Sequence, residues 1–80
     1  MKTVTLFSKA DCHLCDVAKG VLLNAQKKVP FELHEKKISE GDSDYDTYEA
    51  RVPVILIDGE FGFQYRVSEQ RLLARLKEKA

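Results

Sequence analysis

The chain has 80 residues, of which 44% are hydrophobic and 32% charged, and this length predicts a single domain covering 1–80. Thirteen basic residues balance thirteen acidic ones, so nothing in the net charge favours nucleic acid or an anionic membrane surface. No apolar run has the length of a signal peptide or a membrane span. We therefore expect a protein of the reducing cytoplasm that binds neither membranes nor nucleic acid.

The first half of the chain predicts a strand, a helix and a second strand. Lys2–Phe7 is rich in Thr, Val and Phe, as strands are, and Asp11 is the expected N-cap of the helix that follows. Pro30 ends that helix, and Phe31 and Leu33 alternate with polar residues in the next strand. Two such strands form a parallel pair joined by a right-handed crossover. The helix should bury one apolar face, made of Leu14, Val17, Ala18, Val21, Leu22, Ala25 and Val29.

The second half predicts a short helix, a hairpin and a final helix. Ser43 is the expected cap of the short helix within 41–50. The apolar run Val54–Ile57 predicts a strand buried on both faces, and the Asp58-Gly59 pair predicts a type I′ turn into a further strand. Ser68 then caps a helix that buries Leu72, Leu73 and Leu76. We expect the aromatic residues to lie in the core or on a sheet face, with one of them lining a substrate groove as the alternative: Tyr45, Tyr48, Phe61, Phe63 and Tyr65.

The two cysteines of the chain, Cys12 and Cys15, are separated by two residues at the junction of the first strand and helix. This spacing allows a disulfide, a metal site or a cycling dithiol. A disulfide that closes so short a loop constrains the unfolded chain little, so chemistry explains it better than stability. Together with the strand and helix, the spacing favours a redox site.

Two alternatives to a redox site remain open. His13 and His34 are the other candidates for binding a soft metal, and their positions predict no complete metal site within one chain. A site shared between two chains, holding a metal or an iron–sulfur cluster, is one alternative. A domain that only docks partners, with incidental thiols, is the other.

The order of these elements resembles the thioredoxin fold in its minimal, glutaredoxin-like form. The residues that carry the resemblance are Phe7-Ser8-Lys9 before Cys12-His13-Leu14-Cys15, then Val52-Pro53-Val54 and Ile57-Asp58-Gly59. The expected fold is α/β, with element order βαβ-α-ββα and a four-stranded mixed sheet flanked by helices. Two features depart from glutaredoxins: Arg51 replaces the usual threonine before Val-Pro, and 62–68 lacks the Gly-Gly-x-Asp stretch that the family uses for glutathione. The chain looks like the short dithiol proteins without the full glutathione signature.

A thiol–disulfide oxidoreductase is the function that follows. Cys12, at the helix start, is the expected nucleophile, because unpaired backbone N–H groups and the helix dipole favour a thiolate there. Lys9 and His13 add positive or hydrogen-bonding character, and Cys15 resolves the mixed disulfide. The resemblance implies a cis Val52–Pro53 bond beside the cysteines, with the Val52 backbone pairing with substrate.

Arg51 either contacts a substrate carboxylate or is a solvated charge. The expected partners are a disulfide-containing protein or a small thiol, and glutathione or a reductase as electron donor. We expect a monomer that holds no metal and no resident cofactor.

Overall fold

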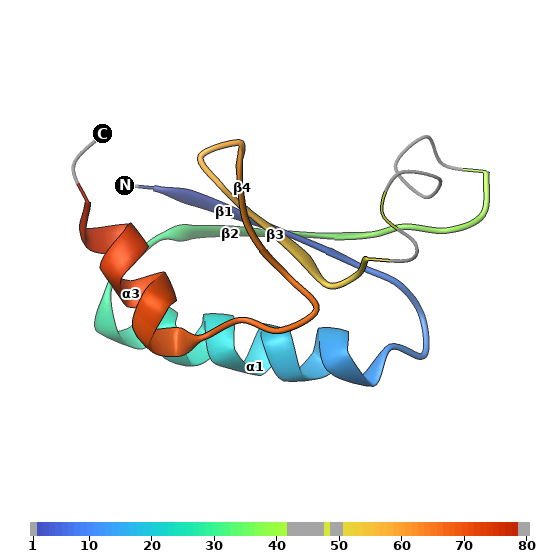
Figure 1. The fold of residues 1–80 in the computed structure, drawn as a ribbon, viewed down its shortest axis with the longest axis horizontal. Coiled ribbons are helices and arrows are strands. Elements are labelled where there is room, and N and C mark those ends of the chain that lie inside the picture. Colours follow the sequence, from blue (N-terminus) through green and yellow to red (C-terminus); the bar gives the residue numbers. More distant parts are fainter. Residues whose placement is uncertain (1, 42–47, 49–50, 79–80) are drawn as a thin grey trace.

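The computed structural model describes residues 2–41, 48 and 51–78. In chain order the elements are β1 (Thr3–Ser8), α1 (His13–Lys28), β2 (Glu32–Lys37), β3 (Val54–Ile57), β4 (Glu60–Gln64) and α3 (Glu69–Lys77). The strands form one sheet in the order β2-β1-β3-β4 (Figure 1). Strands β1 and β2 are parallel, while β1–β3 and β3–β4 are antiparallel. The predicted thioredoxin-like α/β fold with a mixed four-stranded sheet is thereby confirmed.

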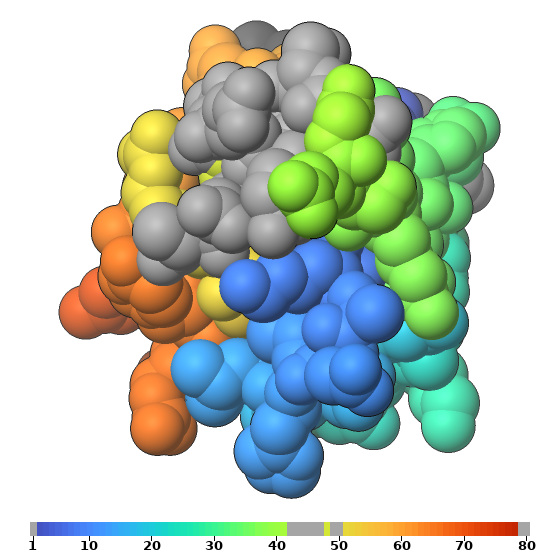
Figure 2. All heavy atoms as spheres, turned by 90° about the vertical axis from the view of Figure 1, so that its right-hand side faces the viewer, coloured from blue at the N-terminus to red at the C-terminus, as the bar shows by residue number. Residues whose placement is uncertain are grey.

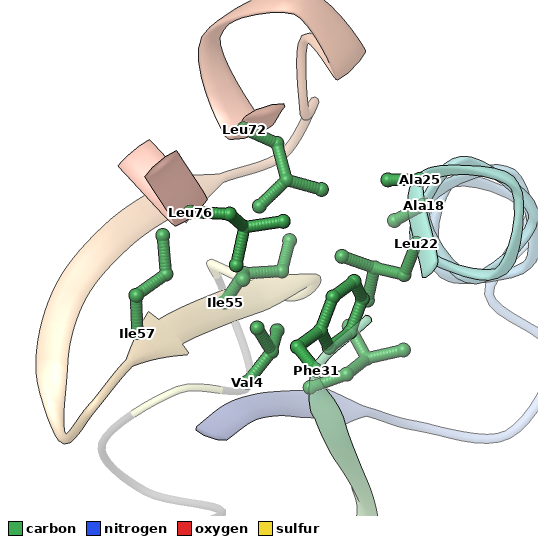
Figure 3. Close-up of a cluster of buried hydrophobic side chains, with 10 residues drawn as sticks. Val4, Ala18, Leu22, Ala25, Phe31, Ile55, Ile57, Leu72 and Leu76 are labelled. Carbon is green, nitrogen blue, oxygen red and sulfur yellow. The ribbon is translucent and has the colours of Figure 1, made fainter. Parts of the chain in front are cut away.

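Both helices lie on the same side of the sheet (Figure 1). The main core lies between the sheet and the two helices. Figure 3 shows side chains from the sheet and from both helices converging there. Leu22 of α1, Ile55 of β3 and Leu72 of α3 have no exposed surface. The other buried members of this cluster are Val4, Leu6, Ala18, Ala25, Phe31, Ile57 and Leu76.

The buried face of α1 is narrower than predicted. Ala18, Leu22 and Ala25 are buried, but Val17 is 50% exposed. A helix turns about 100° per residue, so a residue next to Ala18 in sequence points well away from the line that Ala18, Leu22 and Ala25 define. The prediction that Val17 belongs to the core was wrong.

The β3–β4 hairpin has the predicted turn. Asp58 and Gly59 have φ angles of 52° and 82°, and a type I′ turn requires positive φ at both positions. The register shifts beyond the turn, because Ile55 pairs with Phe63 whereas Leu56 pairs with Phe61. This bulge makes Gly62 the extra residue of β4. Phe63 packs against the main core, but Phe61 is 56% exposed.

The structure describes only part of what was predicted for the two helices of the second half of the chain. The Ser68 hydroxyl caps α3 by accepting the Arg71 N–H at 3.3 Å, as predicted. Ser43 and Tyr45, expected in a short helix, lie outside the described residues. Tyr48 is described, and its ring stacks on Phe7 with centroids 4.6 Å apart. In the described part of the chain, neither helix is long and apolar enough to cross a membrane.

Candidate functional site

The two cysteines stand at the first turn of α1. Cys12 is the N-cap, with an extended backbone, and its Sγ accepts a hydrogen bond from the Cys15 N–H at 3.1 Å. The two sulfurs form a disulfide, and the Cα atoms are 5.2 Å apart. The prediction of Asp11 as N-cap was therefore wrong. Asp11 has a left-handed backbone with φ of 57°, and the helix begins later, where the Cys12 sulfur satisfies the free N–H.

The two cysteines differ in access to solvent. Cys15 is only 3% exposed, whereas Cys12 is partly exposed. Cys15 belongs to a second buried cluster, and Cys12 packs against its edge. The remaining buried members of this cluster are Phe7, Ile38, Val52 and Val54. An outside disulfide can therefore reach the sulfur of Cys12 more readily than that of Cys15.

The segment before β3 lies against the cysteines. The Val52–Pro53 peptide bond is cis, as the resemblance implied. Val52 is 7% exposed and shares the second cluster with Cys15, so the structure brings these two predicted site residues together. Arg51 is exposed, and its backbone N–H donates to the Tyr48 carbonyl at 2.8 Å.

Lys9 and His13 are adjacent to the cysteines along the chain. Lys9 is half-buried in the loop between β1 and α1, and His13 is exposed at the first position of α1. Among the described residues, neither side chain makes a hydrogen bond or an ion pair. In the same part of the chain, no group of three or more His, Cys, Asp or Glu side chains could hold a metal ion.

A small groove borders α1 near the cysteines, and the sequence did not predict all of its lining. Its volume is about 170 Å³, and Val17 and Tyr65 are its most exposed apolar residues. Figure 2 views the molecule from this end, with the blue junction of β1 and α1 beside the orange segment that follows β4. The Tyr65 N–H donates to the Pro53 carbonyl at 2.9 Å, which fixes this segment beside the cis proline. The lining residues are Leu14, Val17, Ala18, Tyr65, Arg66 and Val67.

Tyr65 is one of the aromatic residues for which a position in a substrate groove is the alternative, and the structure places it in the lining of this groove. Val17 lies three residues after Leu14 and four before Val21, so helical spacing alone assigned it to the apolar face of α1. Arg66 and Val67 carried no signal of their own. They reach the groove because Tyr65 turns the chain with a left-handed backbone, φ 66°.

One carboxyl group outside this site has a shifted pKa. The Thr3 backbone N–H donates to Asp58 at 2.9 Å, and this hydrogen bond is the main cause that lowers the pKa of Asp58 below 3.8. Burial opposes the shift, and the nearby Lys2 ammonium supports it. Asp58 therefore holds the hairpin turn to the start of β1 and has no part in the site at the thiols.

A family model described as "Glutaredoxin-like domain (DUF836)" matches residues 3–77. Among solved structures, the target protein XcR50 from X. campestris is 29% identical, with a TM-score of 0.75 over 91% of this chain and 93% of that one. Protein Ne2328 from Nitrosomonas europaea is 26% identical, with a TM-score of 0.80 over 95% and 92%. Glutaredoxin 1 from Francisella tularensis, complexed with cacodylate, is 18% identical over 94% and 92%, and its TM-score of 0.54 shows a shared fold.

Proposed function

The chain belongs to the glutaredoxin-like domain family, and from this premise we propose that it is a thiol–disulfide oxidoreductase acting through Cys12 and Cys15. The observation that carries the proposal is the placement of the two sulfurs. One caps a helix N-terminus and is partly exposed, and the other is buried one turn further along. This asymmetry suits an attacking thiol and a resolving thiol.

The first step is attack on a substrate disulfide by the reduced protein. The Cys12 thiolate forms a bond to one substrate sulfur, the substrate S–S bond breaks, and the departing thiolate takes up a proton. The Cys15 N–H and the positive end of the α1 dipole favour the thiolate form of Cys12. An ordinary thiol has a pKa of about 8.5, so such stabilisation raises the fraction that reacts near neutral pH.

The second step releases the product. The Cys15 thiol loses its proton and attacks the Cys12 sulfur, so the bond from Cys12 to the substrate sulfur breaks and the Cys12–Cys15 disulfide forms. The second substrate sulfur leaves as a thiolate and takes up a proton. The substrate gains two electrons, and the protein is oxidised by two. Glutathione or a reductase then returns those electrons. Burial of Cys15 supports this order, because its sulfur reaches Cys12 without being open to other disulfides.

The residues around the sulfurs take supporting roles in this proposal. The Val52 backbone, before the cis proline, pairs with the substrate chain, and Arg51 meets a substrate carboxylate. Lys9 and His13 supply positive or hydrogen-bonding character beside the sulfurs. The substrate is a protein or small-molecule disulfide, and the protein works as a monomer in the cytoplasm, without a metal or a resident cofactor.

The rate of alkylation by iodoacetamide against pH, on fully reduced protein, tests the proposal. Mass spectrometry then identifies the modified sulfur. We expect modification of Cys12 alone, with an inflection at or below about pH 7.5. Equal reaction of both cysteines with an inflection near 8.5 would contradict activation and favour a docking domain.

A trapping experiment assigns the two roles. The Cys15→Ser variant should accumulate a mixed disulfide on Cys12, because nothing resolves it, whereas Cys12→Ser should form none. An adduct carried by Cys15 in Cys12→Ser, at the rate seen for the other variant, would overturn the assignment. Absorbance and metal analysis of protein purified without oxygen test the alternative of a cluster shared between chains.

A further inference from the structure

A second groove lies between β4 and α3. Its volume is about 330 Å³, and it is lined by Gly62, Phe63, Arg71, Ala74 and Arg75. Figure 1 shows α3 at the opposite end of the molecule from the N-terminal end of α1, where the cysteines stand. This groove shares no lining residue with the one beside the cysteines. It is therefore a separate feature of the surface.

Two of the residues that line the groove are small, Gly62 of β4 and Ala74 of α3. Gly62 is the extra residue of the β4 bulge, and a Cβ there would lie 3.0 Å from the Ile55 carbonyl oxygen and 3.2 Å from Ile57 Cδ1. No side chain larger than hydrogen fits at Gly62 without movement of the neighbouring strand. Ala74 contributes only a methyl group from α3. Half-buried Phe63 lines the same groove.

The charge of the groove is positive. Arg71 and Arg75 are four residues apart on α3, so their side chains are neighbours on the helix surface. Among the described residues, neither guanidinium makes an ion pair or a hydrogen bond. By contrast, Glu69 at the start of α3 does form an ion pair, with Lys28 of α1. Two like charges at this spacing destabilise a helix, and an anion bound between them would reverse that effect.

We propose that this groove binds a small molecule that carries a phosphate or carboxylate group on a flat apolar ring. The two guanidinium groups offer planar sets of N–H donors, which match the oxygens of such an anion. The ring would lie against Phe63 and Ala74. A volume of about 330 Å³ is at the lower end of the range for small-molecule sites, which suits one ring and one anionic group.

The test is an NMR titration of the full chain with phenyl phosphate, followed through the backbone amide signals. We expect shifts centred on Gly62, Phe63 and 71–75, weaker shifts of the same amides with inorganic phosphate, and none there with benzyl alcohol. Arg71→Gln and Arg75→Gln should each raise the Kd about tenfold, the loss expected for one charged hydrogen bond. The control Lys27→Gln removes an exposed cation from α1 and should leave the Kd unchanged.

A second variant fills the space instead of removing charge. Ala74→Leu should weaken phenyl phosphate binding while both arginines remain, whereas Gln70→Leu, at an exposed position of α3 outside the lining, should not. The proposal is overturned if the shifts map to the cysteine end of α1. It is also overturned if the arginine variants bind as tightly as Lys27→Gln. Neither result would bear on the thiol chemistry of Cys12, which the alkylation experiment measures separately.

Discussion

Cys12 has two roles in this fold, because the sulfur proposed as nucleophile also caps α1. A matched pair of substitutions separates them. Cys12→Ser keeps an oxygen that can accept the Cys15 N–H, whereas Cys12→Ala leaves that N–H without its side-chain acceptor. Both variants should lose disulfide exchange completely, but only the alanine variant should lose the cap.

The size of the stability difference follows from the single hydrogen bond involved. Replacing an N-cap serine by alanine typically costs about 1 kcal/mol. A domain of 80 residues has a free energy of unfolding of roughly 4–12 kcal/mol, so this is a measurable fraction. For a domain of this size it corresponds to a difference in Tm of about 4–8 °C. Thermal unfolding of both variants under reducing conditions, followed by circular dichroism, measures it.

The neighbouring position provides the control. His13 is the first helical residue of α1 and is exposed, so it does not cap. There His13→Ala should be at least as stable as His13→Ser, because alanine is the better helix former. If Cys12→Ala and Cys12→Ser unfold at the same temperature, the sulfur is not a functional cap, and the reasoning about thiolate stabilisation loses its structural basis.

Three further predictions concern the scaffold. The folded-state pKa of Asp58 is lowered, mainly by the Thr3 N–H, so this group adds stability above its unfolded pKa and loses it as the pH falls through the folded value. Asp58→Asn should therefore flatten the pH dependence of stability below about pH 4, and identical acid unfolding curves would contradict this. Gly20→Ala, on the exposed side of α1, should stabilise the protein by about 0.5–1 kcal/mol, whereas Gly62→Ala should destabilise it in urea unfolding, because its Cβ would meet a backbone oxygen of β3 at 3.0 Å. Leu72→Ala should reduce the free energy of unfolding by about 2–5 kcal/mol, and a loss below 1 kcal/mol would mean that the vacated space collapses.

The elements that local chemistry determines could be predicted from the sequence. The turn at Asp58-Gly59 needs positive φ at two adjacent positions, and the Ser68 cap needs a hydroxyl before an apolar helical face. Both signals lie within a few residues, so tertiary packing hardly alters them. The parallel pairing of β1 with β2 followed from the strand–helix–strand order, and the pairing of β3 with β4 followed from the hairpin turn, whereas the antiparallel pairing of β1 with β3 was not predicted.

The features that depend on contacts across the fold were harder to predict. The bulge at Gly62 arises from the pairing of β4 with β3, so the prediction of a strand after the Asp58-Gly59 turn gave no sign of it. Val17 has helical spacing relative to Leu14 and Val21, but α1 buries the neighbouring row of Ala18, Leu22 and Ala25. The groove beside the cysteines needs Tyr65, which reaches it through a hydrogen bond to Pro53, twelve residues earlier in the chain.

The spacing of the cysteines connects fold and chemistry. An N-cap side chain accepts a hydrogen bond from the backbone N–H two or three residues later, and Cys15 is three residues after Cys12. Two intervening residues therefore place the second cysteine where its own N–H binds the first sulfur. The same turn of helix directs the Cys15 side chain into the cluster around Val52. The start of α1 thus gives the exposed sulfur of Cys12 an N–H donor and buries Cys15. If Asp11 were the cap, Cys12 would lie inside the first turn, and its sulfur would lack that donor.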